Sequence, residues 1–254
     1  MVFSALARRR ERIAIPPAVP EGVRVYAIGD IHGRLDLFEV LIERIRADHA
    51  ARSPARLCLV LLGDLVDRGP DSSGVIERAM ALSGDVDELR CLLGNHEEVF
   101  LQAAGGDVKA LRFFTRIGGR ETLASYGIDG DEYRRADFDE LMTMVQARVP
   151  ARHIAFLRTF EDVVIQGDYA FVHAGIRPGK SIEEQRPKDL RWIREDFIMD
   201  ETPHDKLIVH GHTITDDVEE CSNRIGIDTG AYMSGMLTAL CLEGRERWYL
   251  KTGG

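Results

Sequence analysis

Five short apolar runs in this sequence each lead directly into a polar block rich in glycine, aspartate, asparagine and histidine. The blocks occupy residues 29–33, 63–69, 94–97, 172–175 and 209–213. Short apolar runs that end in turn-forming residues are typical of strands buried inside a sheet. The chain is therefore expected to fold around sheets whose strand ends carry its polar chemistry.

The order of the elements indicates an α/β fold class. Apolar strands are predicted at 23–28, 57–62 and 89–93. Two helical patterns separate them, one at residues 73–82 and one marked by Phe38, Leu41, Ile42 and Ile45 at helical spacing. Strand, helix, strand, helix, strand is the pattern of a parallel sheet with covering helices.

The rest of the chain changes character near residue 160. Residues 97–160 carry helical periodicity, whereas the second half is mostly strands, with hairpins expected at 163–173 and 236–250. No repeat or long linker divides it. We expect one α/β domain (α+β in some schemes) at residues 23–254, with two sheets or one mixed sheet and the helices outside.

Composition narrows the function classes. Of the 254 residues, 44% are hydrophobic and 30% charged, so disorder is not expected as the main state. There are 33 Lys and Arg against 42 Asp and Glu, a net charge of −9 that disfavours nucleic-acid binding. No segment reaches the roughly 18 uncharged apolar residues that a membrane span needs, so neither nucleic acid nor membrane is an expected partner.

Residues 1–22 are predicted to form a basic, proline-containing leader without the apolar stretch of a secretory signal. The four cysteines lie far apart and are expected to be small core residues in a reducing compartment: Cys58, Cys91, Cys221 and Cys241. Together these features predict a cytoplasmic protein.

The polar blocks have the composition of a metal site. Strand carboxyl ends converge on one crevice in an open α/β sheet, so the blocks should meet in space. Asp, His and Asn offer the oxygen and nitrogen ligands that divalent metals accept, and Asp30 and His32 lie two residues apart, pointing the same way in an extended segment. The number of ligands favours two metals, with Asp64 as a carboxylate able to bridge them. Any one block also occurs in proteins without metals, but burying five such blocks without a counter-charge would be costly.

The five blocks, in this order, resemble the motifs of the calcineurin-like metallophosphoesterases. More narrowly they resemble the phosphoprotein phosphatase branch, which includes bacteriophage lambda phosphatase, bacterial serine/threonine protein phosphatases and symmetrical diadenosine tetraphosphatases. The similarity runs from residue 23 to about residue 250. It implies a two-sheet sandwich flanked by helices, with the metal site at the carboxyl ends of the strands.

The resemblance implies a set of metal ligands: Asp30, His32, Asp64, Asn95, His173 and His212. The first two would hold one ion and the last three the other, with Asp64 bridging. The implied cofactors are two divalent ions, with Mn²⁺ expected and iron, zinc or cobalt also compatible with these ligands. Water held between the ions would attack phosphorus in line, without a covalent phosphoenzyme.

The resemblance also assigns residues to the substrate. His96 would protonate the leaving group while Asp67 orients its ring. Arg68 and Arg194, together with Asn95, would bind the phosphate. Arg191 is the alternative to Arg194, because the motif around them is loose.

The remaining histidines are assigned other places. His210 is expected to support the site from behind or to pack, because the family pattern gives metal binding to His212. His49, His153 and His204 have no partners in the sequence and are predicted to lie at the surface.

Three functions fit the resemblance. Residues 118–127 resemble the bacterial and phage enzymes, which favours a serine/threonine protein phosphatase acting on phosphorylated proteins or peptides. The alternative is a symmetrical diadenosine tetraphosphatase, which acts on dinucleoside polyphosphates. A non-catalytic phosphoprotein-binding module is less favoured, because every ligand position and His96 are intact. Tyrosine against serine/threonine preference, the native metal and the oligomeric state stay open.

Overall fold

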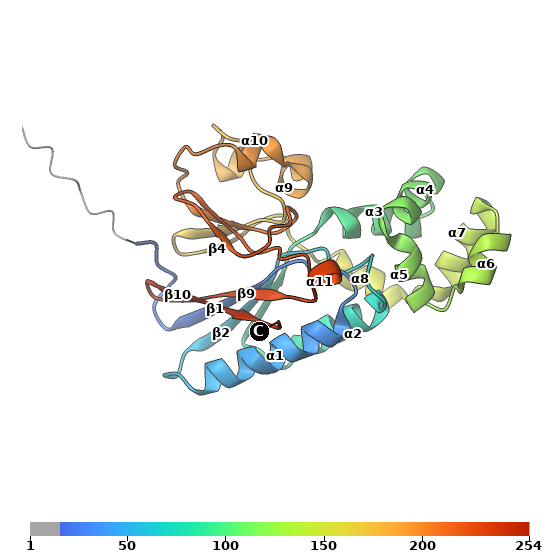
Figure 1. Ribbon diagram of the computed structural model, residues 1–254. Helices are drawn as coiled ribbons and strands as arrows, with labels where there is room; N and C mark the ends of the chain where they lie inside the picture. Colours follow the sequence, from blue (N-terminus) through green and yellow to red (C-terminus); the bar gives the residue numbers. More distant parts are fainter. Residues whose placement is uncertain (1–15, 254) are drawn as a thin grey trace, which may run out of the picture.

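The computed structural model describes residues 16–253. Two five-stranded sheets pack face to face around a shared core, and helices cover their outer faces (Figure 1). The first sheet has the order β10-β9-β1-β2-β3 and the second the order β4-β5-β6-β8-β7. The predicted α/β sandwich of two sheets with flanking helices is therefore confirmed.

Each sheet has a parallel centre with antiparallel strands at its edge. The strands are β1 Val23–Ile28, β2 Arg56–Leu61, β3 Glu88–Cys91, β4 Val164–Gln166, β5 Tyr169–Phe171, β6 Leu207–His210, β7 Glu219–Glu220, β8 Arg224–Gly226, β9 Thr238–Glu243 and β10 Glu246–Lys251. Strands β1, β2 and β3 run parallel in the first sheet, as do β5, β6 and β8 in the second.

The helices fall into groups that cover different surfaces. They are α1 Leu35–Ala50, α2 Ser72–Leu82, α3 Asn95–Ala104, α4 Val108–Ile117, α5 Gly119–Ser125, α6 Gly130–Arg135, α7 Phe138–Arg148, α8 Ala151–Leu157, α9 Pro187–Trp192, α10 Glu195–Ile198 and α11 Ala231–Ser234, with a 3₁₀ turn at Ile182–Glu184. Helices α1 and α2 cover the first sheet, and α9 and α10 cover the second.

Strand β1 shows why its sequence is apolar almost throughout. Successive side chains of a strand point to opposite faces of the sheet. Val25 and Ala27 face the core between the sheets, whereas Tyr26 and Ile28 face the core beneath α1 and α2. Both faces of the strand are therefore buried, as in other parallel sheets covered on both sides.

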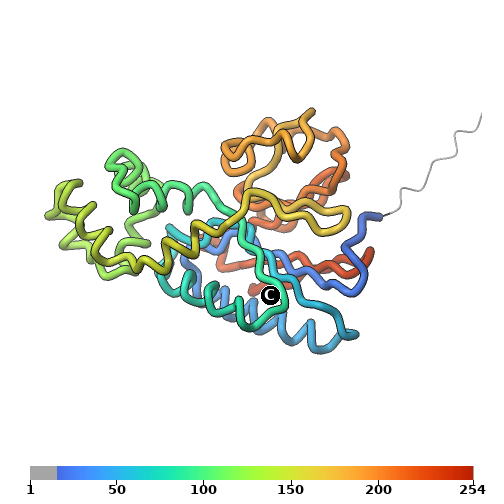
Figure 2. Tube along the Cα trace, turned by 180° about the vertical axis from the view of Figure 1, so that it is seen from behind, coloured from blue at the N-terminus to red at the C-terminus, as the bar shows by residue number. Residues whose placement is uncertain are grey.

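Helices α3 to α8 form a layer beside the sandwich with a hydrophobic core of its own (Figure 2). In this core the rings of Phe100 and Phe114 stack with centroids 5.2 Å apart. Two of its helices, α3 and α4, end at glycines, Gly105 and Gly118. The packing fixes the end of α4, which approaches the polar blocks.

Two sequence predictions about side-chain placement are wrong. His153 was expected at the surface but is buried, with Nδ1 2.8 Å from the Tyr126 hydroxyl and Nε2 2.7 Å from Glu77 Oε1. Cys221 is exposed, whereas the other three cysteines lie in the core as predicted. In both cases the tertiary neighbours, which the local pattern does not contain, decide the burial.

Two other histidines and part of the N-terminal segment are also more buried than a surface position implies. His49 and His204 are half-buried. Of the predicted leader, residues 1–15 lie outside the described part, while Val19 is buried in the inter-sheet core and its amide donates to the Gly244 carbonyl at 2.9 Å. Within residues 16–253, no helix has the length and apolar character required to cross a membrane.

One charged side chain is fully buried near the amino end of β1, the central strand of the first sheet. Arg24 donates through Nε and Nη2 to the two carboxylate oxygens of Glu243, each at 2.9 Å, and through Nη2 to the Ser53 carbonyl at 2.7 Å. A buried guanidinium needs such partners, because removing one leaves an uncompensated charge.

We therefore expect Glu243→Ala to lower the free energy of unfolding by about 3 kcal/mol, since Arg24 would keep its charge without a carboxylate partner. Urea unfolding followed by circular dichroism measures this change. The matched control is Glu246→Ala on the same hairpin, where an exposed side chain is lost and a change within about 0.5 kcal/mol is expected. Equal effects of the two variants would contradict the structural importance of the pair.

Candidate metal centre

The polar blocks meet where the two sheets come together. Asp30 follows β1, Asp64 follows β2, His173 follows β5 and His212 follows β6, and all four side chains are buried. The backbone amide of His212 donates to both carboxylate oxygens of Asp30, at 3.2 and 3.1 Å, which ties the end of one sheet to the end of the other. The predicted convergence of strand ends is thus observed between two sheets rather than within one.

Backbone strain is concentrated in these blocks. Among residues 16–253, the non-glycine residues with positive φ are His32, Asp64, Asp67, Arg68 and His212, with angles between 45° and 75°. Left-handed backbone is costly for such residues and persists only where the surrounding structure enforces it. All five are residues that the sequence assigned to the site, so the fold maintains this strain where the chemistry is expected.

The glycines in the blocks allow close approach. A Cβ atom placed on Gly211 would lie 2.0 Å from Asp30 Oδ1, and one placed on Gly94 would lie 2.2 Å from Asp64 Oδ1. No side chain fits at these separations, which explains why glycine stands beside the ligands.

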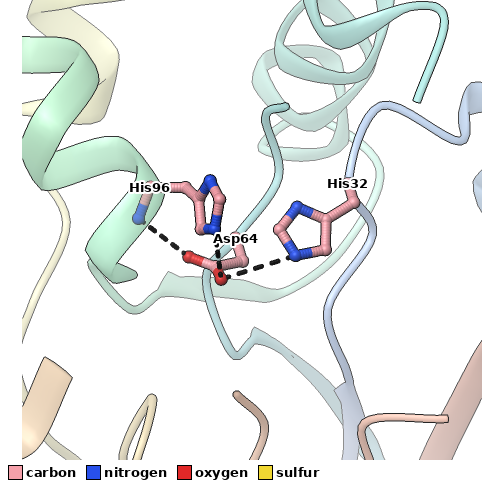
Figure 3. Close-up of side chains that lie close together, drawn as sticks. All are labelled: His32, Asp64 and His96. Carbon is pink, nitrogen blue, oxygen red and sulfur yellow. Dashed lines mark hydrogen bonds and ion pairs between the residues drawn. The ribbon is translucent and has the colours of Figure 1, made fainter. Parts of the chain in front are cut away.

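Asp64 lies at the centre of the site. Its carboxylate oxygens are 3.5 Å from His32 Nε2 and 3.9 Å from His96 Nε2 (Figure 3). They are also 3.4 Å from His173 Nε2. Two groups of potential ligand atoms share it, one formed with His32 and His96 and the other with His173 and His212. These two buried clusters are consistent with a dinuclear metal site in which Asp64 is common to both ions.

The imidazole rings are oriented as metal ligands require. His32 Nδ1 lies 2.7 Å from the Val66 carbonyl and His173 Nδ1 lies 2.8 Å from the Leu62 carbonyl. A carbonyl only accepts, so in each ring Nδ1 carries a proton, and Nε2, which faces Asp64, is the nitrogen left to bind a metal. Asn95 Oδ1 joins this set at 3.0 Å from His173 Nε2. The residues present therefore fit divalent cations.

The charges of the site also call for cations. Burial, together with the nearby carboxylates of Asp228 and Asp64, raises the pKa of Asp30 well above its usual range. Burial likewise raises the pKa of Asp228 to about 6. By contrast, although burial opposes it, the rings of His173 and His96 hold the pKa of Asp64 well below its usual range. Three buried carboxylates in one place are stable as anions only with positive charge among them.

Two buried carboxylates of the site were not singled out from the sequence. Asp228 follows β8 as Asp30 follows β1, and the same rule of an acid after an apolar run would have found it. Glu97 accepts hydrogen bonds from the backbone amides of Asp64 at 2.7 Å and Leu65 at 2.7 Å, and it also receives those of Val66 and Gly94. Glu97 therefore fixes the loop that carries Asp64, a role that no local sequence signal reveals.

His96 forms a buried pair with Asp67. Its Nδ1 lies 2.6 Å from Asp67 Oδ2, and the other oxygen of Asp67 accepts from the Thr122 hydroxyl at 2.7 Å. Burial alone would lower the pKa of His96, but the carboxylates of Asp64 and Asp67 outweigh it and raise the pKa. The ring is thus oriented and holds a proton more strongly than a free histidine.

Two arginines approach the ligand nitrogens from different sides. Arg68 places Nη1 2.9 Å from His32 Nε2 and Nη2 3.0 Å from His96 Nε2. Arg194 donates from Nε to His212 Nε2 at 3.0 Å. The structure therefore brings both arginines to the site.

The alternative arginine and the ambiguous histidine lie outside this arrangement. Arg191 is turned away toward Asp162 and Glu98, at 2.7 and 2.8 Å. His210 packs against Phe197 with ring centroids 5.1 Å apart, and its Nδ1 lies 3.0 Å from the Gly211 carbonyl. Its position behind the site matches the supporting or packing place expected for it.

Comparison with known proteins identifies the family. The sequence matches the calcineurin-like phosphoesterase family over residues 23–232. The chain belongs to this family. Its two buried His/Asp clusters are consistent with a dinuclear metal site.

Several curated relatives of this chain are named bis(5'-nucleosyl)-tetraphosphatases. It is 35% identical over 160 residues to the symmetrical bis(5'-nucleosyl)-tetraphosphatase of an Acidovorax species, which covers 63% of this chain and 47% of that protein. It is 28% identical to the asymmetrical bis(5'-nucleosyl)-tetraphosphatase PrpE of Anoxybacillus flavithermus, covering 84% of this chain and 88% of that one. The phosphoesterase thus spans about half the length of the symmetrical relatives that it matches.

Solved structures share the fold. A provisionally assigned diadenosine tetraphosphatase superposes with a TM-score of 0.62 at 20% identity, covering 93% of this chain and 98% of that one. A cold-active protein tyrosine phosphatase superposes with a TM-score of 0.59 at 18% identity, covering 92% and 81%. At these identities the likeness shows the fold alone, so the protein phosphatase assignment gains no specific support.

Asp64→Asn tests the centre directly. The amide keeps the shape of the side chain but removes the charge between the two clusters, so we expect metal content to fall from two ions per chain to one or none. Elemental analysis after loading with Mn²⁺ and gel filtration measures it. The control is Asp139→Asn on α7, an exposed acid of the helical layer that should leave two ions bound. Two ions in Asp64→Asn would exclude a bridging role.

Proposed function

We propose that this phosphoesterase hydrolyses dinucleoside polyphosphates, cleaving a phosphoanhydride bond by direct attack of water. This proposal rests on the names of its curated relatives, which include symmetrical and asymmetrical tetraphosphatases. The sequence alone favoured a serine/threonine protein phosphatase, and the comparisons support the alternative better. Two arginines directed at one buried site also suit a substrate whose negative charge extends over several phosphates.

The ligand assignment is part of the proposal. Asp30 and His32 would hold one ion, Asn95, His173 and His212 the other, and Asp64 both. When bound, two divalent ions lower the pKa of water, orient the phosphate and stabilise the attacking and leaving oxygens. We propose Mn²⁺ as the ion, since the mixed oxygen and nitrogen donors accept it.

The protein's own residues would then act on the substrate. The guanidinium groups of Arg68 and Arg194 contact His32 and His212. They would bind phosphate oxygens of the substrate, with Asn95 beside them. Water forms the new P–O bond as the bridging P–O bond breaks. His96 delivers its proton to the departing oxygen, and Asp67 keeps the ring in place.

A substrate comparison tests the proposal. Manganese-loaded enzyme is offered diadenosine tetraphosphate, a phosphoserine peptide, a phosphotyrosine peptide and p-nitrophenyl phosphate in parallel. We expect kcat/KM for the dinucleotide to exceed that for either peptide by about 100-fold or more, and chromatography of the nucleotides to show whether cleavage is symmetrical. A larger kcat/KM for a phosphopeptide would return the assignment to a protein phosphatase.

His96→Asn separates the role of the acid from metal binding. Alkoxide leaving groups need a proton far more than a phosphate leaving group, whose second pKa is about 6. We therefore expect the variant to slow the phosphoserine peptide by about 10²–10⁴-fold and diadenosine tetraphosphate much less, with two ions still bound.

The pH profile gives a second reading of the same variant. Because its carboxylate neighbours raise the pKa of His96, the acid is protonated below that pKa, and turnover of alkyl esters should fall as pH rises through it. This alkaline limb should disappear in His96→Asn. Equal slowing of both substrates with an unchanged limb would show that His96 is not the acid.

A further inference from the structure

An aromatic pair joins the helical layer to the cover of the second sheet. Phe113 on α4 is 43% exposed although it is a large apolar side chain. Its ring lies 6.2 Å from the ring of Trp192, at the end of α9, with the planes tilted by 33°. The two rings come from segments that flank α3, the helix that begins with Asn95 and His96.

Hydrogen bonds link the segments that carry the two rings to the metal centre. Trp192 Nε1 donates to Glu98 Oε2 at 2.6 Å, and Glu98 lies one helical turn after Asn95. Arg194, two residues after Trp192, reaches His212. On the other side, the carbonyl of Gly118, directly after α4, accepts the backbone amide of Arg68 at 3.0 Å. The pair therefore stands on the two segments that deliver the phosphate arginines.

A positively charged side chain, that of Arg116, lies near this aromatic pair. Arg116 lies three residues after Phe113, so the two are neighbours on the surface of α4. It is exposed, and within residues 16–253 it makes no hydrogen bond or ion pair, whereas Arg191 is held by Glu98 and Asp162. An aromatic surface beside a free guanidinium is the combination that binds a base with its phosphates.

We propose that Phe113 and Trp192 stack on the two faces of one nucleobase of the substrate. Arg116 would bind a phosphate beyond those held at the metals. A base stacked between two rings needs two contact distances of about 3.5 Å, or about 7 Å between parallel planes. The two rings, now tilted by 33°, would therefore have to align and separate to admit it. This site rests on the function proposed above and specifies how the nucleoside part of the substrate is recognised.

Inhibition of p-nitrophenyl phosphate hydrolysis tests the site without using the dinucleotide as substrate. ADP should inhibit more strongly than inorganic pyrophosphate, which lacks the base. Phe113→Ala should raise the inhibition constant of ADP about tenfold, the scale of losing one stacking surface, and leave that of pyrophosphate unchanged. Phe113→Tyr keeps the ring and should retain ADP inhibition. The control is Val40→Ala on α1, which is similarly exposed.

Fluorescence gives a reading that does not depend on turnover. The chain has two tryptophans, so Trp248→Phe leaves Trp192 as the only one. Saturable quenching by ADP, with weaker binding in the double variant that also carries Phe113→Ala, is expected.

The outcomes separate this site from the proposed function. ADP and pyrophosphate inhibiting equally, or both weakened equally by Phe113→Ala, would overturn the base site whatever the enzyme does to diadenosine tetraphosphate. So would a KM for phosphopeptide that depends on Phe113 while ADP binding does not. ADP-specific loss in an enzyme that prefers phosphopeptides would instead support the site and overturn the proposed substrate.

Discussion

The buried carboxylate of Asp64 is the constraint on which the rest of this structure depends. It lies between three imidazole nitrogens at 3.4 to 3.9 Å, and its own backbone is left-handed. An anion is buried at great cost unless it is matched by positive charge. The buried carboxylates of Asp30 and Asp228 lie nearby and add further negative charge. The site therefore favours a pair of divalent cations.

Packing and hydrogen bonds elsewhere in the fold hold these strained turns in place. Extensive cores on both faces of the first sheet hold β1 and β2 rigid, so the strained turns after them have no room to relax. Glu97 gathers the amides of the Asp64 turn, and Asp67 and Thr122 orient His96. The candidate metal centre is thus held in shape by side chains that are not themselves proposed to bind metal. Their importance is visible only in three dimensions.

Chemistry and substrate choice reside in different parts of the molecule. The polar blocks at the strand ends lie within residues 23–232, the region that matches the calcineurin-like phosphoesterase family. The helical layer with Phe113 and the segment from Trp192 to Arg194 lie outside these blocks. The resemblance of residues 118–127 favoured a protein phosphatase, whereas the names of the curated relatives support the proposed dinucleotide substrate better.

The sequence by itself determined the apolar strands, the order of the elements and the polar blocks that converge. These are local properties, because burial on both faces makes a strand continuously apolar and a close approach excludes every residue but glycine. The folded arrangement was needed to show that Arg194 and not Arg191 faces the site, that Glu97 holds the loop of Asp64, and that His153 is buried. Each of these depends on partners far along the chain, and no local pattern encodes which side chains will meet when two sheets and a layer of helices close on one another.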